Sequence, residues 1–199
     1  DGIVYTADAD AIMDVVEDDD ANGCLSILTT ADDDDLGYGY TVADSMRLRD
    51  GKKFFMKTKF ELTVTTVATS CLFIGLCDSL SPATSTPAFM PATGLHPVAS
   101  DDVIGFVKYN AESIVNGVIG ENNVHDHVPL HTMVTAVWVT LGMYFDGTDL
   151  YMYVNDVPAA AITPSAIPIS QMGPVFWLRA HADEVTQLLV DYLFVAAER

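Results

Sequence analysis

The clearest indication of the fold is a stretch of three consecutive runs: Trp138-Val139-Thr140-Leu141-Gly142-Met143-Tyr144-Phe145, then Asp146-Gly147-Thr148-Asp149, then Leu150-Tyr151-Met152-Tyr153-Val154. Its first and last runs are rich in β-branched and aromatic residues, which favour strands. The Asp-Gly pair between them is a strong signal for a tight turn. The stretch therefore predicts an antiparallel β-hairpin.

A second long strand precedes the hairpin in the chain. Alternate residues from Phe54 to Val64 are mostly apolar, and those from Phe55 to Thr63 are mostly polar. This period of two predicts a strand with one buried face and one wet face. Further strands are predicted at residues 72–78, 103–109, 114–119, 132–145, 175–179 and 188–197.

The whole chain is therefore expected to be all-β. No segment has a sustained helical period, and roughly ten strands joined by turns predict a two-sheet antiparallel jelly-roll sandwich. Residues 1–199 are predicted to form a single domain, since 199 residues suit one unit of this kind. Two Pro- and Ala-rich stretches, near 79–102 and 158–174, are predicted to be long loops.

Charge excludes some classes of partner. Acidic residues outnumber basic ones 28 to 9, which gives a formal net charge of −19. A nucleic-acid groove needs lysine and arginine, and an anionic membrane surface would repel this chain. No run of 18 apolar residues occurs, so no membrane span is predicted.

The three cysteines, Cys24, Cys71 and Cys77, are predicted to be reduced, packed thiols.

The predicted hairpin and its surroundings resemble concanavalin A-like (laminin G-like) jelly-roll domains. There an aromatic strand, an Asp-Gly turn and a strand ending in Tyr-Val-Asn-Gly follow one another, whereas this chain has Asp156 in place of the last glycine. Residues 188–196 resemble the final strand of the same superfamily. Residues 51–55 and 73–78 resemble jelly-roll proteins of tailed-phage particles. The resemblance implies the sandwich fold and a place in a virion.

The superfamily includes glycoside hydrolases, which need two carboxyl groups across the scissile bond. The β-glucanases of this fold carry them as Glu-x-Asp-x-x-Glu on one strand, and nothing here matches. Glu61 stands alone on its strand, and the other glutamates are isolated. No nucleophilic triad, dinucleotide fingerprint or Walker loop occurs. The chain is therefore expected not to be an enzyme.

No metal or cofactor is expected either. The runs Glu17–Asp20 and Asp32–Asp35 could bind calcium, but they lack the alternating spacing of a preformed loop, and solvated loops are the simpler interpretation. His125, His127 and His131 have a spacing that suits zinc on a strand. Pro129 interrupts them, so a polar loop is the favoured interpretation.

Two groups of residues could form contacts. Six of the nine basic residues lie within residues 47–59, as a local positive strip that either docks onto neighbours or pairs with the acidic runs: Arg47, Arg49, Lys52, Lys53, Lys57 and Lys59. The aromatic residues of the hairpin, Trp138, Tyr144, Tyr151 and Tyr153, could stack on sugars if exposed. Sandwich core is the favoured interpretation for them.

The leading functional hypothesis is a non-enzymatic virion protein that decorates and stabilises a tailed-phage capsid through protein–protein contacts. Its partners would be capsid or other virion proteins in an oligomeric assembly, and its location the virion, assembled in the host cytoplasm. The alternative is a lectin-type carbohydrate-binding module, which would use the rim loops and calcium held by Asp32–Asp35.

Overall fold

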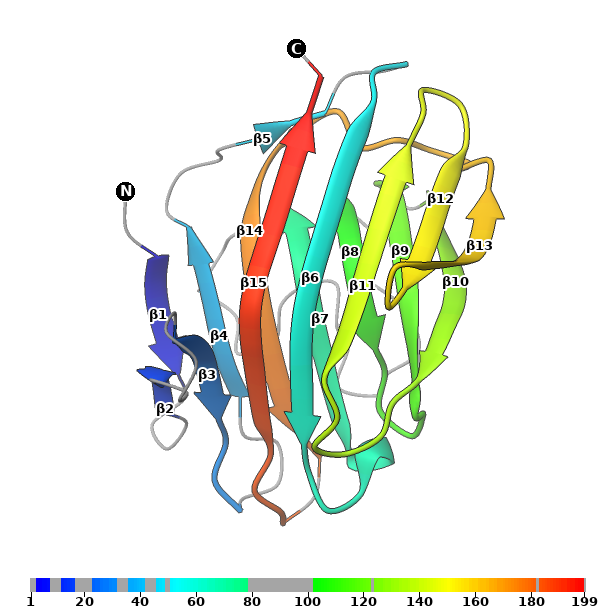
Figure 1. Cartoon of the computed structure of the whole chain (residues 1–199). Helices are drawn as coiled ribbons and strands as arrows, with labels where there is room; N and C mark the ends of the chain where they lie inside the picture. Colours follow the sequence, from blue (N-terminus) through cyan, green and yellow to red (C-terminus); the bar gives the residue numbers. More distant parts are fainter. Residues whose placement is uncertain are drawn as a thin grey trace.

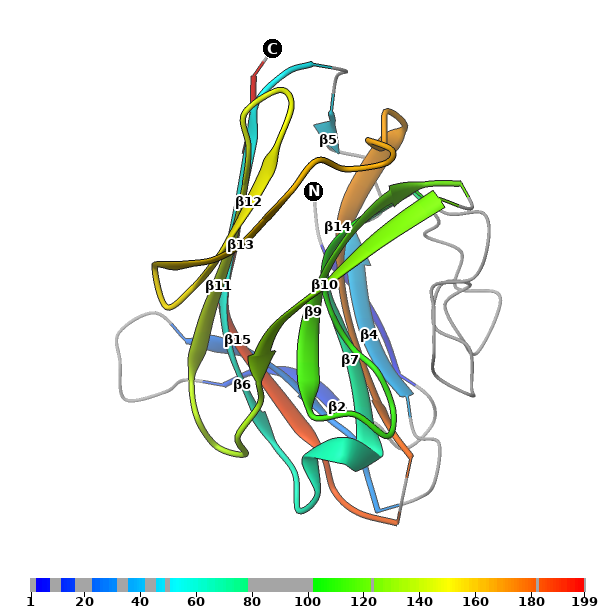
Figure 2. The same cartoon turned by 90° about the vertical axis from the view of Figure 1, so that its right-hand side faces the viewer.

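The computed structural model describes residues 3–7, 12–16, 23–31, 36–41, 46–48, 51–78, 102–122, 124–181 and 183–198. Among these residues, antiparallel strands form two sheets that lie face to face (Figures 1 and 2). One sheet has eight strands in the order β1-β4-β14-β7-β8-β9-β10, with β5 beside β14. The other has seven in the order β13-β12-β11-β6-β15-β3-β2. The prediction of an all-β, two-sheet antiparallel sandwich is confirmed.

Fifteen described strands make up the two sheets. The strands are β1 (Ile3–Ala7), β2 (Ile12–Val16), β3 (Cys24–Leu28), β4 (Leu36–Thr41), β5 (Met46–Arg47), β6 (Phe54–Thr63), β7 (Ser70–Cys77), β8 (Val103–Lys108), β9 (Ile114–Glu121), β10 (Val124–Thr132), β11 (Val139–Phe145), β12 (Leu150–Val154), β13 (Val157–Ile162), β14 (Gln171–Ala180) and β15 (Gln187–Ala197). One turn of 3-10 helix, η1 (Val67–Thr69), precedes β7. No described segment is a helix long and apolar enough to cross a bilayer.

The main core lies between the sheets. The inward residues of β6 alternate strictly with half-buried outward ones, as predicted, and pack against buried residues of β7, β8 and β14. From the predicted hairpin, Leu141, Met143 and Phe145 of β11 and Leu150 and Met152 of β12 enter this core. Each such side chain stabilises the fold by about 1.5–3 kcal/mol through burial.

The eight-stranded sheet is buried on its other face as well. A second apolar cluster contains only residues of this sheet and its ends, among them Phe73, Val107, Val118 and Trp177. Cys71 and Cys77 belong to this cluster, and Cys24 is also buried. The expectation of packed thiols is confirmed. Strands β7 and β8 are buried at every position, which explains why their sequences read as continuous apolar runs.

Two predicted loops are partly strands. The stretch after Glu121 forms β10, paired with β9, although Pro129 lies within it. The connection predicted at 158–174 is shorter than expected, because β13 pairs with β12 up to Ile162 and β14 begins at Gln171. Both β10 and β13 are outermost among the described strands, where proline is tolerated. Residues 79–101, 17–20 and 32–35 lie outside the described residues.

Candidate functional site

Five of the aromatic side chains on the outer face of the seven-stranded sheet form a group that we call the aromatic face, and Phe55 and Phe194 contact each other on the same side of the sheet. The members are Trp138, Tyr144, Tyr151, Tyr153 and Tyr192, and all are half-buried. The prediction that the hairpin aromatics are sandwich core is therefore wrong. Alternation along β11 and β12 gives the core to Leu141, Met143 and Met152, and leaves the aromatic rings on the opposite side.

The hairpin register brings the rings together. β11 pairs with β12 so that Tyr144 lies opposite Tyr151, and their rings stack with centroids 6.3 Å apart. Tyr153 lies opposite Gly142, where the absence of a side chain leaves room for its ring. Cross-strand aromatic pairs of this kind stabilise a sheet by roughly 0.2–1 kcal/mol. The aromatic side chains form a rigid surface because strand pairing fixes the positions of their backbones.

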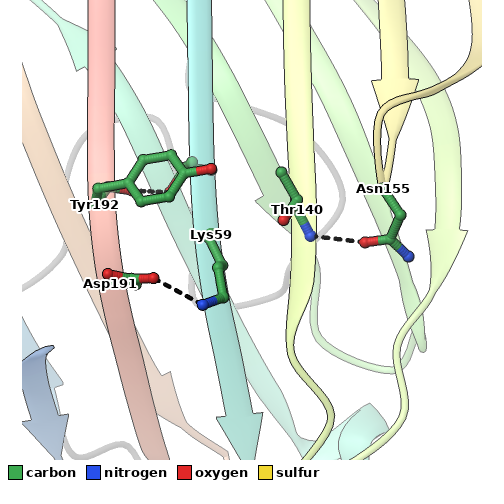
Figure 3. Close-up of polar contacts among 6 residues, drawn as sticks. Lys59, Thr140, Asn155, Asp191 and Tyr192 are labelled. Carbon is green, nitrogen blue, oxygen red and sulfur yellow. Dashed lines mark hydrogen bonds and ion pairs between the residues drawn. The ribbon is translucent and has the colours of Figure 1, made fainter. Parts of the chain in front are cut away.

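A β-bulge on β15 supplies the fifth ring. The pairing of β15 with β6 shifts between Val190 and Tyr192, so that Asp191 is the extra residue. The buried Thr58 hydroxyl donates a hydrogen bond of 2.8 Å to the Tyr192 carbonyl and fixes the bulge. A bulge re-aims neighbouring side chains. Here Tyr192 reaches from β15 toward β6, while the Asp191 carboxylate meets Lys59 (Figure 3).

Lys59 is held on two sides. Its Nζ donates to Asp191 Oδ2 at 2.8 Å and lies 4.9 Å from the centre of the Trp138 ring. That distance is within the range of a cation–π contact. The hydrogen bond to Asp191 raises the pKa of Lys59 above its usual value. Trp138 is therefore fixed against a charged pair, with ammonium donors and a carboxylate acceptor beside its ring.

The turn between β12 and β13 supports a second charged pair. Asn155 and Asp156 both have left-handed backbones, with φ of 49° and 65°. Asn155 is tied to β11 by two hydrogen bonds to Thr140: its backbone N–H donates to the Thr140 carbonyl. Its side-chain oxygen accepts from the Thr140 backbone N–H, as Figure 3 shows. The Asp156 carboxylate lies 2.6 Å from Lys57 Nζ. This bond raises the pKa of Lys57, so the residue that replaces the expected glycine neutralises a lysine.

The Asp-Gly turn of the hairpin is closed by its own aspartate. Asp146 Oδ1 accepts hydrogen bonds from the backbone N–H groups of Thr148 and Asp149, each 2.9 Å long. These bonds hold the pKa of Asp146 below its usual value, the bond from Asp149 contributing most. The Tyr151 hydroxyl donates to the same carboxylate at 3.4 Å. The nearby negative charge raises the pKa of Tyr151.

The described residues of the predicted positive strip lie on different sheets. Arg47 lies on β5, beside the eight-stranded sheet, and bonds to the Ile169 carbonyl. Lys52 lies 3.5 Å from Glu198, and Lys53 precedes β6. Lys57 and Lys59 are both on the aromatic face side of β6, each paired with a carboxylate. Arg49 is outside the described residues. These pairs join described residues, whereas the acidic runs lie outside the described part of the chain, so pairing with those runs and docking onto neighbours both stay predictions.

A second polar group lies at the eight-stranded sheet. The Tyr109 hydroxyl and His127 Nδ1 are 2.9 Å apart, and His181 Nε2 lies 2.8 Å from Cys71 Sγ. Burial raises the pKa of Tyr109. His125 and His127 share one side of β10, as His-x-His predicts for a strand. The described residues hold no group of three His, Cys, Asp or Glu side chains that could bind a metal.

A cavity of about 420 Å³ lies between the sheets beneath β15. Its lining is mostly apolar and includes Leu25, Leu76, Phe176 and Leu193, with Asp191 and Tyr192 as its polar members. Sugar recognition needs several convergent polar groups in addition to apolar surface. Within the described part of the chain, the aromatic face therefore offers the better set of groups for a polar ligand.

Sequence comparisons find no matching family model and no matching curated protein. Solved structures do match. The carbohydrate recognition domain of Emp47p has a TM-score of 0.62 at 11% identity, over 98% of this chain and 86% of that one. Alginate lyase AlyC3 has a TM-score of 0.58 at 10% identity, over 91% and 77%. A protein of unknown function from Shewanella oneidensis MR-1, SO2946, has a TM-score of 0.56 at 8% identity, over 94% and 78%.

These similarities correct one prediction and confirm another. Fold neighbours with known roles include alginate lyases and a carbohydrate recognition domain, which contradicts the prediction of a phage decoration protein. The predicted location in a virion is not tested and stays a prediction. Identities this low show the fold alone. The chain has the two-sheet jelly-roll sandwich fold that these solved structures share.

Proposed function

We propose that this protein binds carbohydrate through the aromatic face and does not transform it. The observation that carries the proposal is the placement of five half-buried rings on one sheet face, outside both apolar clusters. A cluster of aromatic side chains on an exposed sheet face is typical of a binding surface. Sugar rings have apolar C–H faces that stack on such rings, and hydroxyls that need polar partners.

The polar groups beside the rings fit hydroxyl recognition. Lys59 and Asp191 offer a donor and an acceptor within 2.8 Å of one another, next to Trp138. Lys57 and Asp156 repeat this arrangement near the second turn. Hydrogen bonds to charged groups are about twice as strong as neutral ones. The fold neighbours, which include a carbohydrate recognition domain and alginate lyases, add support for a carbohydrate ligand.

Binding without turnover is the second half of the proposal. Hydrolysis of a glycosidic bond needs two carboxyl groups held at a defined separation. The acids near the aromatic face are already engaged: Asp156 and Asp191 pair with lysines, and Glu61 accepts a bond from the Thr63 hydroxyl.

Tryptophan fluorescence tests the proposal. The chain has two tryptophans, and Trp177 is 1% exposed whereas Trp138 is half-buried. Titration with a panel of oligosaccharides should change the emission of Trp138. The Trp138→Ala variant should lose at least about tenfold in affinity by calorimetry, the scale of a lost aromatic contact. Ile114→Ala, at an exposed position on β9, is the matched control and should bind normally.

Two results would contradict the proposal. Equal affinity of wild type and Trp138→Ala for the same sugar would place binding elsewhere. Release of new reducing ends or of unsaturated, ultraviolet-absorbing products from a bound polysaccharide would show turnover.

A further inference from the structure

We propose that the aromatic face selects neutral glycans and rejects acidic ones, with Asp156 and Asp191 as the residues that determine this specificity. The inference rests on the proposed function and names its ligand class. It departs from the alginate lyases that share the fold, since alginate is a polymer of carboxylate sugars.

The first argument is the state of the cations. A sugar carboxylate is best bound by an arginine or lysine whose charge is not already compensated. Lys57 and Lys59 are the basic residues on the outer side of β6. Lys57 lies 2.6 Å from the Asp156 carboxylate, and Lys59 lies 2.8 Å from the Asp191 carboxylate. An acidic glycan would have to displace an internal carboxylate to reach either ammonium.

The second argument is the local balance of charge. The charged residues on the outer side of β6 and their ion-pair partners are two lysines and three carboxylates, those of Asp156, Asp191 and Glu61, so the formal charge of this set is −1. The whole chain carries −19. A polyanion therefore approaches against a repulsive field, which weakens with salt as the charges are screened. Neutral sugars experience no such field, so aromatic stacking and hydroxyl contacts decide their affinity.

The third argument is that both acids are placed by irregular backbone. Asp191 is the extra residue of the bulge on β15, and Asp156 occupies a left-handed position that glycine would fill without strain. Neither acid is required by the core, because the inward neighbours of both carry the packing. The exposed fraction of the Asp156 side chain is 72%, so burial does not explain it either.

The test compares charge classes with one pair of variants. Asp156→Asn with Asp191→Asn removes both carboxylates, and asparagine tolerates the left-handed backbone at residue 156. The matched control, Glu121→Gln with Asp183→Asn, makes the same change in net charge at the end of β9 and after β14. Each protein is titrated with neutral glucan, mannan and galactan oligosaccharides and with oligomers of alginate and polygalacturonate, at 50 and 500 mM NaCl.

We expect wild type to bind a neutral oligosaccharide at least about tenfold tighter than any acidic one at low salt, with little effect of salt on the neutral ligand. The double variant should bind the acidic ligands about tenfold tighter than wild type does, so that the ratio of neutral to acidic affinity falls by the same factor. The control variant should leave this ratio unchanged.

A preference of wild type for an acidic oligomer, or an equal gain in the control variant, overturns the assignment of charge class. Absence of binding to both classes is a different result and overturns the proposed function itself.

Discussion

At the scale of single residues, Lys108 is the least expected side chain of the core. It is fully buried at the end of β8, and its Nζ donates to the carbonyls of Ser70 and Tyr109. Desolvation lowers its pKa from 10.5 to about 8. Both carbonyls accept from the ammonium, so the charge is solvated by backbone dipoles in place of water.

Lys108 predicts a specific dependence of stability on pH. Between pH 8 and about 10.5 the unfolded chain binds more protons at this lysine than the folded chain does. The free energy of unfolding should therefore rise with pH across this window, by on the order of 3 kcal/mol from this group. Urea unfolding of wild type and Lys108→Met at pH 7.5 and 10 isolates the contribution. A difference between the two proteins that stays constant with pH would contradict the prediction.

Two features of single residues could not be predicted from the sequence: which hairpin residues face the core, and the position of Asp191 in a bulge. Successive residues of β11 and β12 alternate between two faces of the sheet. Both faces carry large apolar or aromatic groups, so the pattern alone could not say which one meets the second sheet. That choice depends on Leu72, Ile74 and Phe106 of the opposite sheet, which the hairpin sequence does not contain. Asp191 could not be recognised either, because residues 188–197 carry apolar side chains on both faces and so hide the one-residue shift that the bulge causes.

At the scale of strands, the pairing of β7 with β8 depends on a close approach. Gly75 lies opposite Gly105, and the ring of Phe73 covers both. A Cβ atom at residue 75 would lie 2.3 Å from the Ile104 carbonyl oxygen, whereas one at Gly142 would meet nothing closer than 3.7 Å. The first contact involves backbone, so the strands themselves would have to separate.

We therefore expect Gly75→Ala to lower the free energy of unfolding by about 3 kcal/mol, as other overpacked substitutions do. Gly142→Ala, in a strand of the other sheet, is the control and should change it by less than about 0.5 kcal/mol. Denaturant unfolding of the two variants measures the difference. Similar values for both would show that β7 and β8 adjust freely.

The success of strand prediction followed the strength of the alternation. Residues 54–64 and the hairpin at 138–154 were identified because period two and an Asp-Gly turn agree there. β10 and β13 were missed because Pro129 and Pro158 lie in them, and because β13 is rich in alanine. Outermost strands need fewer backbone partners, so they accept residues that a central strand rejects.

For the molecule as a whole, the high net charge lowers the free energy of unfolding. With −19 on 199 residues, repulsion among like charges acts against the compact state. The ion pairs described here involve exposed or half-exposed groups, which contribute little each. Raising NaCl from 50 to 500 mM at pH 7 should therefore raise the Tm by about 2–4 °C, roughly 1 kcal/mol for a domain of this size. Circular dichroism measures it, and a fall in Tm would mean that the ion pairs outweigh the repulsion.

The two prolines in the outermost strands have a consequence for the behaviour of many copies together. A sandwich that does not close into a barrel exposes strand edges, where another chain can add and begin a fibril. Pro129 and Pro158 each remove an N–H donor, and the ladder shifts register next to each of them. An incoming strand would find the repeat of donors and acceptors broken along β10 and β13, and so we expect concentrated solutions of this protein to resist polymerisation through these two edges.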